Sequence, residues 1–131
     1  MENKLEGIFQ VTGWDEKPYS EESDGSKLTK AQVTQTYTGS IKGSSQVEYL
    51  MAYISDKSAV FVGIEKVSGS INGKSGSFII QHDGKFESGV ASSNFVIVAG
   101  SGRGELSGIE GSGCFESTEQ GKSKYQITIN A

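Results

Sequence analysis

The sequence has few of the residue types that build metal, redox and disulfide sites. Its 131 residues include one cysteine, one histidine, one tryptophan and one proline. A single cysteine cannot close an internal disulfide, and one histidine with one cysteine is too few ligands for a structural zinc ion. We therefore expect no metal and no cofactor, and a reducing cytoplasmic location is the simplest interpretation.

Concentrated positive charge and long apolar runs are missing as well. Lys and Arg number 12 against 16 Asp and Glu, a net charge of -4, and the lysines are scattered singly. Nucleic-acid binding would need a concentrated positive field, so we do not expect a nucleic-acid partner. No stretch approaches the ~18 apolar residues of a transmembrane helix, and the first residues, MENKLEG, contain no apolar signal segment. A membrane partner is not expected either.

Glycine is abundant instead, with 18 residues spaced among Val, Ile, Phe and Tyr. Residues 33–41 and 125–129 alternate apolar and polar positions, which predicts strands with one face in water. Residues 46–54 and 59–67 are apolar on both faces, as are strands covered on both sides. The pattern predicts about eight strands: an N-terminal strand over 4–13, hairpins over 29–54, 58–82 and 93–117, and a C-terminal strand over 123–130.

These strands predict one all-β domain over residues 1–131. Several of them would be about 30 Å long at ~3.3 Å per residue, which suits the tilted strands of a barrel better than a flat sandwich. We therefore expect a single closed or nearly closed antiparallel β-barrel, with a β-sandwich as the alternative. Because two strands are apolar on both faces, a homo-oligomer is a candidate assembly.

A phrase of the form G-x-aliphatic-x-G occurs at 39–43, 69–73 and 104–108. Asn72–Gly73, at the end of the middle copy, is a strong signal for a two-residue hairpin turn. From their equivalent positions, Lys42–Gly43 and Ser107–Gly108 are predicted to form turns too.

Four longer stretches carry specific motifs: GIFQVTGWDEKPY, KLTKAQVTQTYTGSIKGSS, VGIEKVSGSINGKSGSFIIQHDG and VAGSGRGELSGIEGSG. The motifs are chiefly G-x-[IL]-x-G-[KR]-x-G-x-F and G-S-G-x-G-E-L-x-G. In these stretches, which cover nearly the whole chain, the sequence resembles a bacterial family, domain of unknown function 3224. The resemblance implies a small β-barrel similar in architecture to allene oxide cyclase and the calycins. It implies no reaction, because the activity of that family is not defined.

Residues 14–28, WDEKPYSEESDGSKL, are the longest segment without strand alternation and are predicted to form a loop. One interpretation is a lid over the barrel mouth, where Trp14 and Tyr19 would contact a ligand and Asp15 or Glu16 would supply a catalytic carboxylate. The alternative is a solvated acidic loop anchored by Trp14.

Glu65 shares a strand face with Phe61 and Val67. If that face points into the barrel, desolvation would raise the pKa of Glu65 and make it a candidate general acid or base. Phe61 would then line the ligand site. If the face points outward, Glu65 is an ordinary solvated side chain.

His82 is predicted to end its strand just before an Asp83–Gly84 turn. It is a candidate proton carrier and ligand contact, and the alternative is a hydrogen-bonded turn residue. Counting back across Asn72–Gly73 places His82 nearer Val62 than Glu65, which argues against a direct contact between His82 and Glu65.

Two charged residues and three tyrosines complete the set of candidate ligand contacts. Arg103 and Glu105 project to the same side of their strand and could anchor an anionic ligand, or pair with charges on neighbouring strands. Tyr37 is expected in the core or in the lining of the lumen, as are Tyr49 and Tyr53.

Three functions from different classes remain, in order of preference. The first is a barrel that binds a small apolar or amphipathic ligand in its lumen. The second is a structural or oligomeric interaction module whose lumen is filled by side chains. The third is an enzyme that uses a buried carboxylate, Glu65 or one of Asp15 and Glu16, in proton transfer or acyl chemistry.

Overall fold

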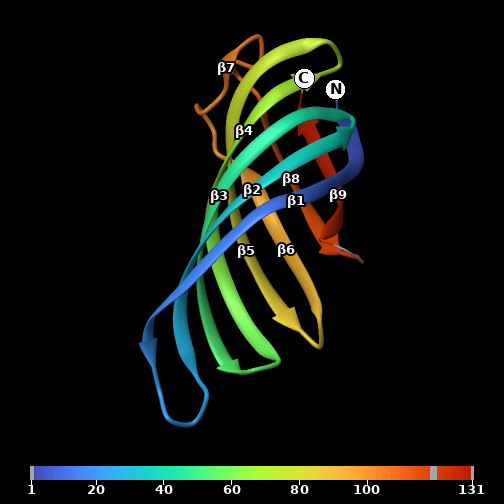
Figure 1. Cartoon of the computed structure of the whole chain (residues 1–131). Coiled ribbons are helices and arrows are strands. Elements are labelled where there is room, and N and C mark those ends of the chain that lie inside the picture. The colour runs from blue at the N-terminus through green and yellow to red at the C-terminus, as the bar shows by residue number, and fades with distance from the viewer. Residues whose placement is uncertain (1, 119–120, 131) are drawn as a thin grey trace.

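The structure is a computed structural model that describes residues 2–118 and 121–130, and this part of the chain is all β. Figure 1 shows long, curved strands joined by short turns. The strands are β1 (Glu2–Glu21), β2 (Lys27–Gly39), β3 (Ile41–Ser55), β4 (Ser58–Ile71), β5 (Lys74–Glu87), β6 (Val90–Ile97), β7 (Arg103–Gly104), β8 (Glu110–Ser117) and β9 (Lys122–Asn130).

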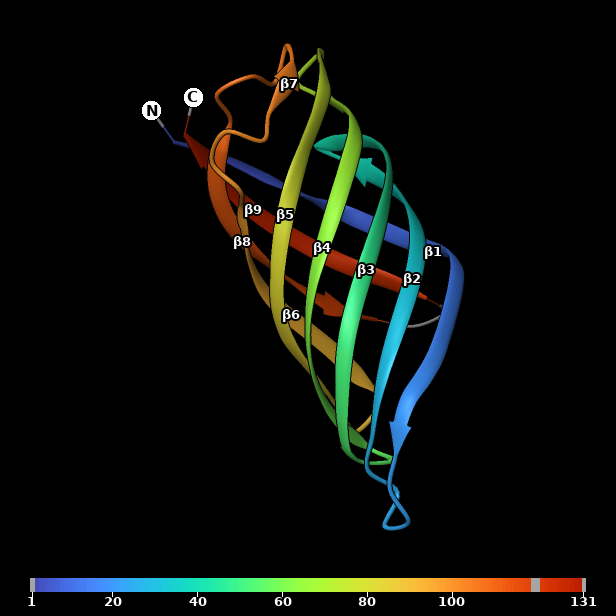
Figure 2. The same ribbon diagram turned by 90° about the vertical axis from the view of Figure 1, so that its left-hand side faces the viewer.

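These strands form one antiparallel sheet that closes into a ring (Figure 2). Each strand from β1 to β5 pairs with the next one in the chain, β6 pairs with β8, and β8 pairs with β9. The ring closes where β9 pairs with β1, and the short β7 adds to β5. The predicted closed antiparallel barrel is confirmed in this barrel-like ring, and the sandwich alternative is not adopted.

The first strand is longer than the sequence predicted. β1 continues to Glu21, which pairs with Lys27, so most of the loop predicted over 14–28 is strand and the turn occupies residues 22–26. The prediction failed because residues 14–21 are largely exposed on both faces and therefore show no apolar alternation. Pairing with the regular strand β2 holds them extended.

A β-bulge in β1 decides which of these side chains face inward. The register with β2 shifts between Val11 and Gly13, which adds one unpaired residue to β1. Beyond the bulge Trp14 pairs with Val33, a fully buried residue of the inner face. Since paired residues share a face, the bulge brings Trp14 to the inner side of the ring.

The structure has turns at two of the three predicted places. Asn72–Gly73 is the predicted turn, with φ angles of 52° and 81° that suit a type I′ turn. Lys42–Gly43 lies inside β3, and the turn comes earlier, at Gly39, whose φ is 93°. Ser107–Gly108 lies in a turn over residues 105–108, where Gly108 has a φ of 86°, but this turn belongs to the longer connection between β7 and β8. The predicted turn at Lys42–Gly43 is therefore wrong, and the one at Ser107–Gly108 forms without closing a two-residue hairpin.

The predicted Asp83–Gly84 turn is also wrong, because β5 runs on to Glu87. Both residues are paired on each side, with β4 and with β6, so ladder hydrogen bonds override the local turn preference. The strand turns instead at residues 88–89, where Ser88 and Gly89 have φ angles of 51° and 85°. His82 therefore lies well inside a strand.

The glycine repeat has a different structural meaning from the one predicted. Gly43 pairs with Gly69, Gly69 with Gly76, and Gly76 with Gly104, so glycines from four strands form one row across the sheet. A Cβ atom on Gly43 would lie 2.1 Å from the carbonyl oxygen of Ser68, too close for any real side chain. The glycines permit a close approach of neighbouring backbones, which lets the sheet coil tightly here.

The ring has two different ends. The closed end carries the glycine row, β7 and the turn at Asn72–Gly73 (Figure 1). The connection between β6 and β8 folds over this end and buries Leu106 and Ile109 in the core with Phe78. The open end carries the turns at 56–57 and 88–89, at the far ends of the same strands.

Candidate functional site

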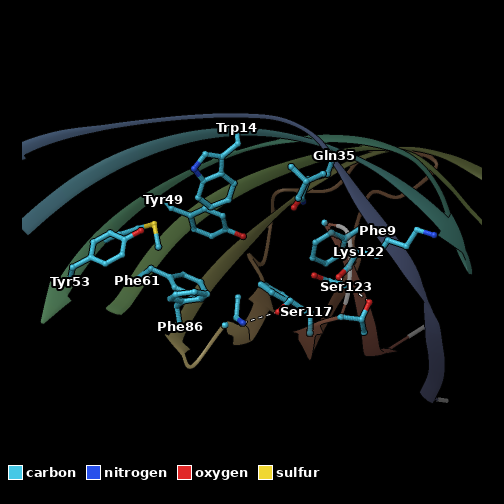
Figure 3. Close-up of a pocket in the computed structure, with 17 residues that line it drawn as sticks. Phe9, Trp14, Gln35, Tyr49, Tyr53, Phe61, Phe86, Ser117, Lys122 and Ser123 are labelled. Carbon is cyan, nitrogen blue, oxygen red and sulfur yellow. Dashed lines mark hydrogen bonds between the residues drawn. The ribbon is translucent and has the colours of Figure 1, made fainter. Parts of the chain in front are cut away.

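A cavity of about 420 Å³ occupies the interior at the open end (Figure 3). Side chains from most of the strands of the ring contribute to its wall, and most of that wall is apolar. Met51 lies in the wall, and the aromatic residues that line it are Phe9, Trp14, Tyr49, Tyr53, Phe61, Phe86 and Phe115. Trp14 and Phe61, which the sequence suggested as ligand contacts, therefore lie together at the cavity.

The rim of the cavity is fixed by hydrogen bonds to Glu16. The indole Nε1 of Trp14 donates to Glu16 Oε1 at 3.0 Å. The hydroxyls of Thr29 and Tyr53 donate to Glu16 Oε2 at 2.7 and 2.8 Å. Burial opposes ionisation of Glu16, but hydrogen bonds from Thr29, Tyr53 and Trp14 outweigh it and lower the pKa of this carboxyl. Burial, together with the bond to Glu16, raises the pKa of Tyr53 to about 12.

Polar residues also line the cavity: Gln35, Tyr49, Ser117, Thr118, Lys122 and Ser123. Tyr49 packs edge-on against Phe61, with ring centroids 5.0 Å apart, and lies 6.4 Å from the Trp14 ring. Burial and the charge of Glu65 raise the pKa of Tyr49 well above its ordinary value, so its hydroxyl stays protonated at neutral pH.

Directly behind the cavity wall lies a buried pair of titratable residues, Glu65 and His82. Their relative exposures are 0% and 2%, and His82 Nε2 lies 2.6 Å from Glu65 Oε1. The His82 ring packs against three aromatic rings, those of Tyr49, Phe95 and Phe115, at centroid distances of 5.1 to 5.6 Å. Glu65 therefore faces inward, as one of the two sequence interpretations required.

The sequence argument against a contact between Glu65 and His82 is wrong. In the register of β4 and β5, His82 pairs with Gly63, and Glu65 pairs with Ile80. Glu65 and His82 are therefore diagonal neighbours on the inner face, and two long side chains bridge such a diagonal easily. Gly63 contributes no side chain that could separate them.

Hydrogen bonds extend this pair into a chain across the interior. Ser93 Oγ lies 3.0 Å from His82 Nδ1 at one end. At the other end the hydroxyl of Tyr37 donates to Glu65 Oε2 at 2.5 Å, and Gln35 Nε2 donates to the same oxygen at 3.0 Å. Burial, then the charge of Glu65, raises the pKa of Tyr37 well above its ordinary value.

The chain of hydrogen bonds is complete within the described residues. No fully buried side-chain nitrogen or oxygen there lacks a hydrogen-bond partner. The groups could pass a proton from one to the next, but neither Glu65 nor His82 lines the cavity. The structure joins the cavity to the chain through one shared residue, Gln35.

The remaining sequence candidates lie elsewhere. Asp15 is on the outer face, 4.0 Å from the amine of Lys17, and Tyr19 is 60% exposed. Arg103 is at the closed end, where its guanidinium donates to the backbone carbonyls of Gly100 and Gly102. Glu105 is at the same end and accepts from the backbone N–H of Ser75. None of these four side chains lines the cavity.

Sequence reasoning missed several residues of this region. Phe86 was missed because the false turn at Asp83–Gly84 ended its strand too early. Ser93 could have been found from alternation, since Ser93, Phe95 and Ile97 share the inner face of β6. Gln35 gave no signal, because one polar residue on an inward face looks like an interruption of the apolar pattern.

These features define a class: a small all-β protein with a closed sheet, a buried polar chain and a ligand-sized cavity at one end. Residues 5–129 match the family described as Protein of unknown function (DUF3224), and the chain belongs to that family. The resemblance predicted from the motifs is thereby confirmed. The likeness to allene oxide cyclase and the calycins stays a prediction.

A solved relative supports both the family and the fold. The chain is similar to the crystal structure of a protein with unknown function from the DUF3224 family of Shewanella oneidensis MR-1. The two share 30% sequence identity with a TM-score of 0.79, over 99% of this chain and 98% of that one. No curated protein matches the sequence.

Two further facts concern membranes and metals. Across residues 2–118 and 121–130, no helix has the length and apolar character needed to cross a membrane. In the same residues, no three His, Cys, Asp or Glu side chains gather in a way that would hold a metal ion. The expectation that the protein uses no cofactor stays a prediction.

Proposed function

We propose that this protein binds a small apolar or amphipathic molecule in the cavity at its open end. One observation carries the proposal: a cavity of about 420 Å³ with a mainly apolar wall that includes seven aromatic residues. Small-molecule sites typically occupy roughly 300–1,000 Å³ and combine an apolar lining with a few polar groups. The hydrogen bonds that hold Trp14 and Tyr53 to Glu16 support it further, because a pre-formed rim lowers the entropy cost of binding.

Binding ranks ahead of catalysis for a geometric reason. A general acid or base must come within about 2.6–3.2 Å of the group it protonates or deprotonates. Glu65 and His82 lie behind the cavity wall, and Asp15 lies on the outer face of the ring. Their catalytic roles, and that of Glu16 at the rim, remain hypotheses.

The test is binding of N-phenylnaphthylamine, whose fluorescence rises in an apolar site. Ala91→Phe places a large side chain on the cavity wall, and Ala99→Phe is the matched control on an exposed loop at the closed end. We expect the wild type and Ala99→Phe to bind the probe equally. Ala91→Phe should bind it at least about tenfold more weakly, because the probe and the new ring compete for one volume. Equal binding by both variants, or no binding by the wild type, contradicts the proposal.

A second property has its own supporting observation, an exposed apolar face on β3 and β4. Leu50, Val60, Val62 and Ile64 lie side by side on the outside of the ring and are each about half exposed. Exposed apolar groups that cluster in this way mark interaction sites more often than single exposed residues do. We propose a second copy of this chain as the partner, which makes the protein a homodimer.

Charge complementarity favours a second copy. Across the middle of the face, Lys30 pairs with Leu50, Leu50 with Val62, and Val62 with Asp83. The row therefore runs from a cation through two apolar residues to an anion. A two-fold axis between two such faces, parallel to the strands, would lay Lys30 of each copy over Asp83 of the other.

Sedimentation equilibrium tests this interface. We expect a dimer for the wild type and a monomer for Val62→Glu, because a buried unpaired charge is costly. Val96→Glu is the matched control, since Val96 is also an outward-facing valine and 47% exposed, but on β6. A monomeric wild type, or a dimer that survives Val62→Glu, contradicts the proposal. Either Lys30→Asp or Asp83→Lys alone should weaken the dimer. The double variant exchanges the two charges and should restore it.

We also propose the cytoplasm as the location, supported by the lone Cys114, a free thiol on the exposed side of β8. Fractionation of cells that express the protein from its own gene would test this, and recovery outside the cytoplasmic fraction would contradict it.

A further inference from the structure

The cavity contains polar atoms that have no hydrogen-bond partner among residues 2–118 and 121–130. Tyr49, Gln35 and Ser123 are only 5%, 3% and 5% exposed. Among the described residues, the Tyr49 hydroxyl, the Gln35 carbonyl oxygen and the Ser123 hydroxyl make no hydrogen bond. Yet no side-chain polar atom that is fully buried in this part of the chain lacks a partner. The three atoms must therefore be reached from the cavity, which all three residues line.

The orientation of Gln35 is set by its neighbours. Its Nε2 donates to Glu65 Oε2 at 3.0 Å and to Ser45 Oγ at 3.2 Å. A flipped amide would turn its carbonyl oxygen toward the Glu65 carboxyl, where two acceptors would meet. The network thus assigns the oxygen to the cavity side. Figure 3 shows Tyr49 and Gln35 extending into the same region of the cavity.

We propose that the cavity selects a neutral amphipathic molecule, whose head both accepts a hydrogen bond from Tyr49 and donates one to Gln35. Its apolar body would lie against Phe61, Phe86 and Phe115. This inference rests on the proposed function and adds the chemical class of the ligand. Primary amides and alcohols have such heads, because each carries a donor and an acceptor close together.

Charge explains why the head should be neutral. Lys122 also lines the cavity, but it is exposed and its side chain points away from Tyr49 (Figure 3). Glu65 lies one hydrogen bond behind Gln35, and its charge contributes to the raised pKa of Tyr49. A carboxylate head at Tyr49 would be desolvated next to a second carboxyl group, which is unfavourable. A cationic head would also lose its hydration, and Glu65 is already engaged by His82, Tyr37 and Gln35.

The experiment compares three probes that share one apolar chain: octanamide, octanoate and octylammonium. Each is titrated at neutral pH against protein loaded with N-phenylnaphthylamine, and displacement gives its affinity. We expect octanamide to bind at least about tenfold more tightly than either ion, because burying an unpaired charge costs far more than burying a paired amide.

Two tyrosine variants identify the group responsible. Tyr49→Phe keeps the ring and removes the unpartnered hydroxyl, so octanamide should bind about three- to tenfold more weakly. Tyr19→Phe is the control. Tyr19 is 60% exposed and does not line the cavity, so the affinity for octanamide and the preference for it over the ions should persist.

The outcomes separate this inference from the proposed function. Displacement by all three probes with equal affinity, or tightest binding of either ion, overturns the neutral head while the proposed function stands. An effect of Tyr49→Phe no larger than that of Tyr19→Phe overturns the role of Tyr49. Failure of N-phenylnaphthylamine to bind the wild type overturns both proposals. Failure of every octyl probe to displace the bound dye overturns the neutral head alone.

Discussion

The two ends of the ring are built from the same strands and are filled differently. At the closed end glycines bring backbones together, and the connection between β6 and β8 inserts Leu106 and Ile109 into the core. At the open end large aromatic side chains surround a cavity of about 420 Å³. The inner faces of both ends are mainly apolar, so apolar character alone does not close a barrel. Backbone spacing and a connection long enough to fold inward decide which end is filled.

The buried polar chain lies between these two regions. Tyr37, Glu65, His82 and Ser93 come from β2, β4, β5 and β6, so their hydrogen bonds tie the strands together across the interior. Buried polar groups cost stability unless they are fully paired, and these are. We infer that the closed end supplies stability, the open end supplies the site, and the chain holds the cavity floor in place.

The largest expected effect is a difference in stability between two Phe→Ala variants on β5, one at each end of the ring. Phe78→Ala removes a ring that is 1% exposed in the closed end and should lower the free energy of unfolding by about 3–5 kcal/mol. Phe86→Ala removes a half-buried ring that already borders a cavity, so the loss should stay below about 2 kcal/mol. Urea unfolding measures both values.

Binding of N-phenylnaphthylamine should rank the two variants in the reverse order, with the larger loss in Phe86→Ala. Phe86→Ala should weaken binding of N-phenylnaphthylamine, whereas folded Phe78→Ala should bind it normally. If the two variants lost equal stability, the ends would not differ in packing, and the comparison would fail.

The next effect concerns the boundary between the ends. The two carboxyl oxygens of Glu65 form hydrogen bonds with His82, Tyr37 and Gln35. Glu65→Gln leaves a single oxygen acceptor, so at least one of these buried groups loses its partner. The expected loss is about 1–3 kcal/mol by urea unfolding. Glu48→Gln, an exposed glutamate on β3, is the control and should change stability little. If Glu65→Gln left the free energy of unfolding unchanged, the hydrogen bonds of Glu65 would contribute nothing to stability.

Alkaline pH provides a third test of the boundary. Tyr37 and Tyr49 have raised pKa values, so in the folded protein they hold their protons above the ordinary tyrosine pKa of about 10. Their contribution to stability is complete below pH about 10 and is lost as the pH rises toward the folded pKa values, with a slope of about 1.4 kcal/mol per pH unit for each tyrosine. Unfolding in urea at increasing pH should show this decline. Tyr37→Phe should reduce the slope, and Tyr19→Phe, on the outer surface, should not.

Much of the fold could be predicted from the sequence, because alternation and one turn are local signals. The strands of the ring follow from period-two patterns, and Asn72–Gly73 fixes the hairpin of β4 and β5. The extension of β1 could not be predicted in this way, since its exposed residues have no apolar period. The turn at Asp83–Gly84 failed because pairing on both sides is a tertiary effect that a local preference does not contain.

The site could be predicted in part. Alternation placed Glu65 and Phe61 on one face, but it could not say that this face is the inner one. The contact between Glu65 and His82 depends on the register of β4 and β5, where an error of one or two residues separates the pair. Trp14 reaches the cavity through a β-bulge that leaves no mark in the hydrophobic pattern. Arg103 and Glu105 were grouped with the site because a sequence does not tell which end of a barrel a turn will close.

The smallest effect is expected at the rim of the open end, from Glu16→Gln. The pKa of Glu16 is lowered in the folded protein, so its contribution to stability is present above its unfolded pKa of about 4.5 and is lost as the pH falls through the folded value. Because Glu16 is largely solvated, the difference between wild type and variant should be well under about 1 kcal/mol at neutral pH and should vanish in acid. Glu48→Gln makes the same charge change away from the cavity and controls for net charge. A larger loss for Glu16→Gln that persists in acid would place the rim among the groups that stabilise the fold, and the division between a stabilising end and a binding end would then be wrong.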